Sequence, residues 1–176
     1  MATTYEAIAT VTVGSGGAAN ITFSSIPATY TDLLVKISSR CDYGEIDQAV
    51  FVRFNGDSAA NYSIRELLGN GSVGVSSLSW SSQTFIFAFQ GAAQNATSNT
   101  FGNIEMYIPN YAGSTNKSVS VDGVTETNAS SGTNRLNSLS ASLWSNTSAI
   151  TSIALTSQNG SFVQYSTATL YGIKNS

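Results

Sequence analysis

The sequence predicts an all-β fold, a single jelly-roll-like β-sandwich of about nine or ten short antiparallel strands. Three observations lead to this prediction. Apolar and polar residues alternate with a period of two along most of the chain. Clusters of Gly, Asn and Ser interrupt the alternation at roughly 8–12-residue intervals. Cys41 is the sole cysteine, so the Cys…Trp…Cys framework of an immunoglobulin-type sandwich is absent.

The first third of the chain carries the clearest alternation. "YEAIATVTV" (5–13) ends at "GSGG", and "ANITF" (19–23) resumes the pattern. "SSIPATY" then forms a corner, because Pro27 cannot donate a ladder hydrogen bond and keeps Ile26 away from helical angles. The next strand is "TDLLVKISSR" (31–40). We expect the two runs that flank the corner to bury Ile21, Phe23, Leu33, Val35 and Ile37.

The remaining strands follow the same logic. "AVFVRF" (49–54) aligns Val50, Val52 and Phe54, and "NGD" is a strong turn signal. "NYSIRELLGNG" (61–71) is predicted to be a strand that leads into a turn, because glycines close it. Further strands are expected in seven segments, 84–90, 101–109, 117–124, 136–144, 149–157, 161–167 and 169–174.

The composition predicts a single domain and argues against a nucleic-acid partner. The chain has 176 residues with no shift in composition, which predicts one domain spanning 1–176. Charged residues make up 10% of the chain, against roughly 25% in typical soluble domains. The seven basic residues are scattered and form no stripe that would neutralise phosphates, which argues against a nucleic-acid partner.

The sequence also favours a protein that is not an enzyme and that uses no cofactor or metal. Histidine is absent, which removes the usual general base and the commonest metal ligand. A single cysteine cannot form a zinc-binding cluster. The beginning of the chain, "MATTYEAIATVTVGSGG", lacks a basic region followed by an apolar run, and no apolar stretch approaches 18 residues. We therefore expect neither a secretory signal nor a membrane partner.

Carboxylates suggest two candidate sites, a calcium site and a catalytic pair. Each group of residues also has a simpler explanation that involves no site. Asp42, Glu45 and Asp47 lie in one loop and present oxygen ligands of the kind that calcium takes. The loop lacks the length and spacing of an EF-hand, so a solvated loop is the favoured interpretation. Glu66 and Glu105 could form a glycosidase pair, which needs a separation of roughly 5–9.5 Å across a cleft. Nothing in the sequence brings these two residues together.

Two tryptophans are candidate glycan-binding or interface aromatics. Trp80 lies in "SSLSWSSQ" and Trp144 in "SASLWSNTS", so both have serine-rich surroundings. An exposed indole ring provides an apolar face on which a sugar stacks. Large aromatics of a β-sandwich more often belong to the core or to an interface.

Several motifs resemble those of small structural proteins of tailed bacteriophages. The resemblance rests on "F-x-x-IP-x-TY-x-x-L" at 23–33, "RFN-x-D-x-x-x-NY" at 53–62 and "LYG" at 170–172. It covers the first third and the end of the chain, whereas residues 71–161 carry no matching motif. The resemblance implies a virion component with a jelly-roll-like domain, made in the host cytoplasm. It brings no catalytic residues.

Two functions are compatible with this resemblance. The first is a capsid decoration (cement) protein, a homotrimer that binds the major capsid protein on the capsid surface and stabilises the mature shell. The N-terminal segment 1–13 is the candidate contact strand with the shell or a neighbouring subunit. The alternative is a tail-fibre or receptor-binding tip domain that recognises host surface glycans, with Trp80 and Trp144 as the glycan-binding residues.

Overall fold

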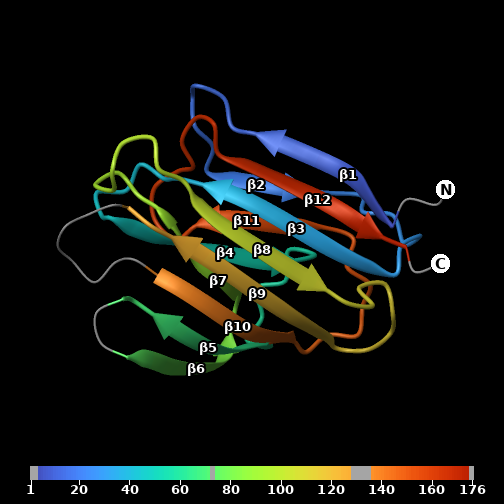
Figure 1. Ribbon diagram of the computed structural model, residues 1–176. Coiled ribbons are helices and arrows are strands. Elements are labelled where there is room, and N and C mark those ends of the chain that lie inside the picture. Colours follow the sequence, from blue (N-terminus) through green and yellow to red (C-terminus); the bar gives the residue numbers. More distant parts are fainter. Residues whose placement is uncertain (1–3, 72–73, 128–135, 175–176) are drawn as a thin grey trace.

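The computed structural model describes residues 4–71, 74–127 and 136–174, which form two antiparallel β-sheets packed face to face (Figure 1). The predicted β-sandwich is confirmed. The described residues contain twelve strands, more than the total of nine or ten that was expected from the twelve candidate segments of the sequence.

The larger sheet has eight strands in the order β1-β12-β3-β8-β9-β10-β5-β6. The smaller sheet has four, in the order β2-β11-β4-β7. The strands of the larger sheet are β1 (Tyr5–Thr12), β12 (Thr167–Ile173), β3 (Asp32–Ser39), β8 (Gly102–Ile108), β9 (Lys117–Thr125), β10 (Leu136–Trp144), β5 (Tyr62–Gly69) and β6 (Val75–Gln83). Those of the smaller sheet are β2 (Asn20–Phe23), β11 (Ile153–Ser157), β4 (Asp47–Phe54) and β7 (Ile86–Ala92).

The core lies between the sheets and follows the alternation of the sequence. The five side chains predicted to be buried around the corner, Ile21, Phe23, Leu33, Val35 and Ile37, are each no more than 3% exposed. The inward residues of β4 and β8 are buried as well, namely Val50, Val52, Phe54, Ile104, Met106 and Ile108. The hydrophobic effect therefore fixes which face of each of these strands points inward.

The Pro27 corner carries the chain from one sheet to the other. β2 precedes it at the edge of the smaller sheet, and β3 follows it inside the larger sheet. Before the corner, the Ile26 N–H donates to the Thr151 carbonyl at 3.0 Å. The corner thus links two consecutive strands, as predicted, and these two strands belong to different sheets.

Two segments differ from the prediction. Residues 161–167 were expected to form a strand, but Phe162 makes isolated bridges with Ala18 and Cys41. A turn follows, in which Tyr165 has a φ of 72° and cannot continue a regular strand. Conversely, β6 was not predicted, because its serine-rich sequence lacks apolar alternation.

Candidate interaction surface

The outer face of the larger sheet, which points away from the smaller sheet, carries a group of aromatic side chains at one end. The strand register places Tyr171, Leu34 and Tyr107 in one cross-strand row on β12, β3 and β8. Tyr5 on β1 extends the group and is 56% exposed. These four residues are called the tyrosine cluster below. Tyr5, Leu34 and Tyr171 line a shallow depression of 310 Å³.

Polar contacts hold the tyrosine cluster in place. The Tyr107 hydroxyl donates to the Asp32 carboxylate at 2.9 Å, and this bond is the main cause that raises the pKa of Tyr107. The same carboxylate accepts the Asn110 N–H at 2.8 Å. Beside the cluster, Lys36 Nζ lies 2.9 Å from the Glu105 carboxylate, which raises the pKa of Lys36. Lys36 and Glu105 thus neutralise each other, the Asp32 carboxylate has two hydrogen-bond donors, and the ring of Tyr107 is fixed by its hydroxyl.

A second apolar group occupies the other end of the same face. Leu67, Val75, Val124 and Leu139, called the leucine–valine cluster below, are between 47% and 72% exposed. Leu139 and Leu67 are direct cross-strand partners on β10 and β5. The cluster lines an open depression of 450 Å³. Contiguous exposed apolar side chains of this kind typically mark a protein interaction site.

The sequence contained a signal for this surface that the alternation analysis did not use. "DLLVK" and "RELLG" each hold two consecutive leucines. Since successive residues of a strand point to opposite faces, one leucine of each pair must leave the core. In the structure these are Leu34, which its neighbours on the outer face cover to 6% exposure, and Leu67, which is 51% exposed.

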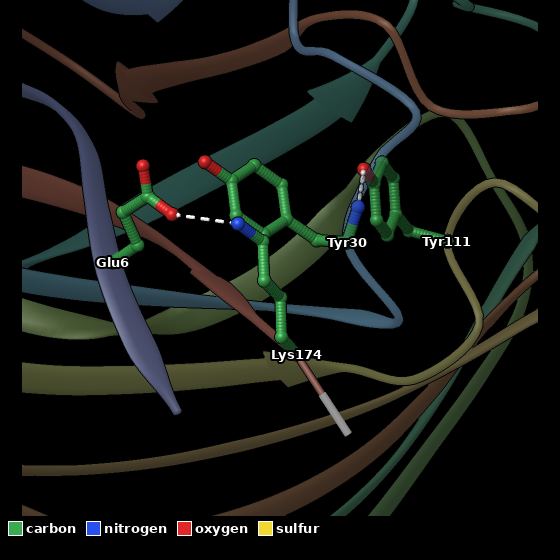
Figure 2. A network of polar contacts seen from close by, with 4 residues as sticks. All are labelled: Glu6, Tyr30, Tyr111 and Lys174. Atoms are coloured by element: carbon green, nitrogen blue, oxygen red, sulfur yellow. Dashed lines mark hydrogen bonds and ion pairs between the residues drawn. The ribbon is translucent and has the colours of Figure 1, made fainter. Parts of the chain in front are cut away.

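A separate network fastens the N-terminal strand to the Pro27 corner (Figure 2). Lys174 Nζ donates to the Glu6 carboxylate at 3.0 Å and lies 5.2 Å from the centre of the Tyr30 ring. The ion pair lowers the pKa of Glu6 and raises that of Lys174. The Tyr111 hydroxyl accepts the Tyr30 N–H at 3.4 Å and donates to the Pro27 carbonyl. These contacts join Glu6 on β1 and Lys174, which follows β12, to the corner.

Trp144 lies in the core. It is fully buried, stacked on Tyr62 and edge-on to Phe54. Its Nε1–H donates to the Asp57 carboxylate at 2.7 Å. Trp144 thus has the core role that the sequence analysis weighed against glycan binding, and its ring faces are covered by protein.

Trp80 lies on β6 and is partly exposed. One face of its ring stacks on Phe87, with the ring centres 5.8 Å apart. Phe87 in turn contacts Phe51, which stacks on Phe85 at 3.8 Å. The Arg53 guanidinium lies 5.8 Å from the centre of the Phe85 ring. This row of aromatic side chains joins β4, β7 and β6, and the sequence analysis did not predict it.

The carboxylates of the acidic loop, Asp42, Glu45 and Asp47, do not form one common metal site. The Asp42 carboxylate accepts the Ser161 N–H at 2.7 Å, whereas Glu45 is exposed. Burial raises the pKa of Asp47, and the neighbouring Glu45 charge adds to the shift. Within the described residues, no three His, Cys, Asp or Glu side chains form a group that could hold a metal ion.

Glu66 and Glu105 lie on opposite faces of the larger sheet. Glu66 points inward, is 5% exposed and accepts a hydrogen bond from the Ser138 hydroxyl at 2.8 Å. Burial raises the pKa of Glu66. Glu105 points outward, toward Lys36. A glycosidase pair must flank one substrate bond, so these two residues do not form one.

Arg40 is held by backbone carbonyls. Its guanidinium donates four hydrogen bonds of 2.9–3.1 Å, to the carbonyls of Gln94, Ala96, Thr97 and Thr100. These bonds satisfy the carbonyls of a loop between β7 and β8. Arg40 is therefore a structural residue that fixes this loop.

No protein-family model and no curated protein matches the chain. In the part of the chain that the structure describes, no helix is long and apolar enough to cross a membrane. The assignment of a function therefore depends on the surfaces described above and on the motifs of the sequence.

Proposed function

We propose that this chain is a non-enzymatic structural protein of a tailed-phage virion, namely a capsid decoration (cement) protein that stabilises the mature shell. The observation that carries the proposal is the outer face of the larger sheet. This face presents the tyrosine cluster at one end and the leucine–valine cluster at the other. The phage-like motifs of the sequence support the same assignment.

The side chains of this face suit an extended contact with the surface of another protein. Tyrosines provide large, rigid contact areas at low cost in conformational entropy. Lys36 and Glu105 are already paired, so covering them leaves no isolated charge. The proposed partner is the major capsid protein, whose repeated surface offers the same contact many times. Copies that bind only the mature shell stabilise it by mass action.

Self-association belongs to the same proposal. The resemblance implies a homotrimer, and closed symmetric assemblies are the usual form of such proteins. The N-terminal segment 1–13 remains the proposed contact strand. Within it, β1 pairs with β12 of the same chain on one side and lies at the edge of the larger sheet on the other.

The first test is the number of copies of this chain per virion, relative to the major capsid protein, measured by quantitative mass spectrometry. A small integer ratio is expected of a decoration protein. A few copies to a few dozen would contradict that assignment and place the chain on the tail.

The second part of this test is binding of the purified protein to shells that lack it. Replacing Leu67 and Leu139 with Asp puts two charges into the contact, and we expect at least a tenfold loss of affinity, about 1.4 kcal/mol. Both side chains are about half exposed, so the fold should survive. Thr22→Asp, on the exposed side of β2, is the matched control. Equal binding by all three proteins would overturn the proposed contact.

The alternative, a tail-fibre tip domain that recognises host surface glycans, is favoured by one observation, the partly exposed ring of Trp80. The stack on Phe87 leaves at most one face of that ring for a sugar. Trp144 is buried and offers none. The copy number separates the two functions, because a tail protein is present in far fewer copies than the shell protein.

A further inference from the structure

The strand β6 (Val75–Gln83) forms one edge of the larger sheet, and among the described residues it is hydrogen-bonded to β5 alone. Natural edge strands usually carry a charged residue, a proline or a bulge, or are very short, because their open backbone groups pair with other strands. β6 is nine residues long, and its sequence, VSSLSWSSQ, contains no charged residue and no proline. Its pairing with β5 is regular from Val75 to Trp80, and a bulge follows at Ser81 and Ser82, where Ser82 has a positive φ.

The opposite edge of the sheet differs. β1 carries Glu6, which forms an ion pair with Lys174, whereas β6 carries no charged residue. A charged side chain makes an edge strand less open to pairing with another strand. β6 is therefore the more open of the two edges of this sheet.

β6 also presents apolar side chains on the inner face of the sheet. Leu78 and Trp80 are the direct partners of the buried residues Glu66 and Ile64 on β5, so they point inward. Leu78 is nevertheless 37% exposed and Trp80 is partly exposed. The smaller sheet ends at β7, which leaves the inner side of β6 incompletely covered.

A second copy of β6 fits this edge. In an antiparallel pair related by a two-fold axis at Ser79, Leu78 lies opposite Trp80 of the second copy, and the same contact is repeated on the other side of the axis. Ser77 then lies opposite Ser81. Cross-strand pairs of an aromatic and an aliphatic side chain stabilise a sheet, and hydroxyl pairs are compatible with it.

Charge does not oppose this pairing. The nearest charged neighbour in the row is Arg65, the partner of Ser79 on β5. In the pair, the two Arg65 backbones are separated by three strand spacings, roughly 14 Å. This exceeds the Debye length of about 8 Å at physiological ionic strength.

We propose that β6 is a self-association strand, and that two copies of this chain join β6 to β6 in an antiparallel pair about Ser79. The two larger sheets then form one continuous sheet. This inference does not depend on shell binding. Because the contact is two-fold, it produces assemblies with an even number of chains, and a trimer formed through another surface would be joined in pairs by it.

The register is tested by cysteine cross-linking in the full chain. Directly opposite residues of an antiparallel pair have Cα atoms roughly 4.5–5.5 Å apart, which suits a disulfide. Under mild oxidation Ser79→Cys should form a covalent dimer in high yield. Thr22→Cys on β2 and Ser77→Cys alone should form no such dimer, whereas Ser77→Cys mixed with Ser81→Cys should form it. The native Cys41 is buried and serves in every variant as the same background.

The assembly itself is tested by light scattering. The mass of the wild-type particle should be an even multiple of the chain mass. Ser79→Lys, which opposes two ammonium groups at the axis, should halve it, whereas Thr22→Lys on β2 should leave it unchanged. A monomer at every concentration, an odd assembly, or a mass unaffected by Ser79→Lys would overturn the inference. Shell binding is measured separately, so a dissociated Ser79→Lys variant that still binds shells leaves the decoration proposal intact.

Discussion

Asp57 shows how one turn residue is tied to the core. Its carboxylate accepts hydrogen bonds from the Ala59 N–H and Asn61 Nδ2, each at 2.9 Å, and from Trp144 Nε1 at 2.7 Å. The bond from Asn61 is the largest of the causes that lower the pKa of Asp57. The "NGD" turn was predicted from the sequence, but the contact with Trp144 was not, because it joins residues 87 positions apart.

The lowered pKa of Asp57 predicts a loss of stability in acid. A carboxyl group whose pKa is lower in the folded state contributes stability above its unfolded pKa, about 3.9, and loses it as the pH falls through the folded value. Asp57→Asn should cost about 1–2 kcal/mol at neutral pH, and the difference from wild type should shrink below about pH 4. Denaturant unfolding at several pH values measures this. A difference that is constant with pH would contradict the assigned role.

At the scale of elements, the strands with regular alternation were predicted correctly and the others were not. β3 and β8 have an apolar residue at every second position, and burial selects that face. Five of the nine residues of β6 are serines and only Leu78 and Trp80 continue an apolar alternation, so its pairing with β5 decides that it is a strand. The segment 161–167 is bonded to neighbouring backbone on both sides, but only through isolated bridges, and the turn at Tyr165 prevents a continuous ladder. Strand formation at the edges of this fold thus depends on partners that are distant in sequence.

The loops at one end of β9 depend on a buried lysine. Lys117 is 1% exposed, and its Nζ donates to the carbonyls of Gly113, at 2.7 Å, and Thr115. Burial lowers the pKa of Lys117. The ammonium group satisfies carbonyls that the loop leaves without strand partners.

Replacing Lys117 with Met should therefore destabilise the protein although it keeps the length and apolar character of the stem. Carbonyls left without donors cost about 1–3 kcal/mol in total. The expected result is a lower melting temperature together with faster amide exchange in residues 113–116. The matched control is Lys36→Met, in which an exposed lysine is replaced. Equal effects of the two variants would show that the carbonyl contacts are unimportant.

At the scale of the whole molecule, the two sheets differ in width, and this difference creates the surfaces discussed above. Four strands of the smaller sheet face eight of the larger one. β5 and β6 lie together at one edge of the larger sheet (Figure 1), where the inner side chain of Leu78 is partly uncovered. The outer face and the β6 edge meet at Val75, but pairing along an edge leaves the outer face of a sheet open, so one can bind a shell while the other binds a second copy.

The scarcity of charge predicts that stability depends little on salt. The ion pairs Lys36–Glu105 and Lys174–Glu6 are both about half exposed. Exposed ion pairs contribute little to stability, and screening removes that contribution as the Debye length falls from about 10 Å at 0.1 M to about 3 Å at 1 M. We expect the melting temperature to change by less than about 4 °C across this range of NaCl. A large fall would mean that ionic contacts support the fold.

The sequence alone determined the fold class, the buried faces of the regular strands and the position of the Pro27 corner. These depend on the period-two alternation and on local backbone restrictions, which consecutive residues carry. Only the tertiary structure decided that the corner joins the two sheets, that Trp144 is buried while Trp80 lies on a partly exposed edge strand, and that Leu67 and Leu139 meet on the outer face. These features require strands far apart in the chain to pair in one register, and that register is set by the packing of the whole core.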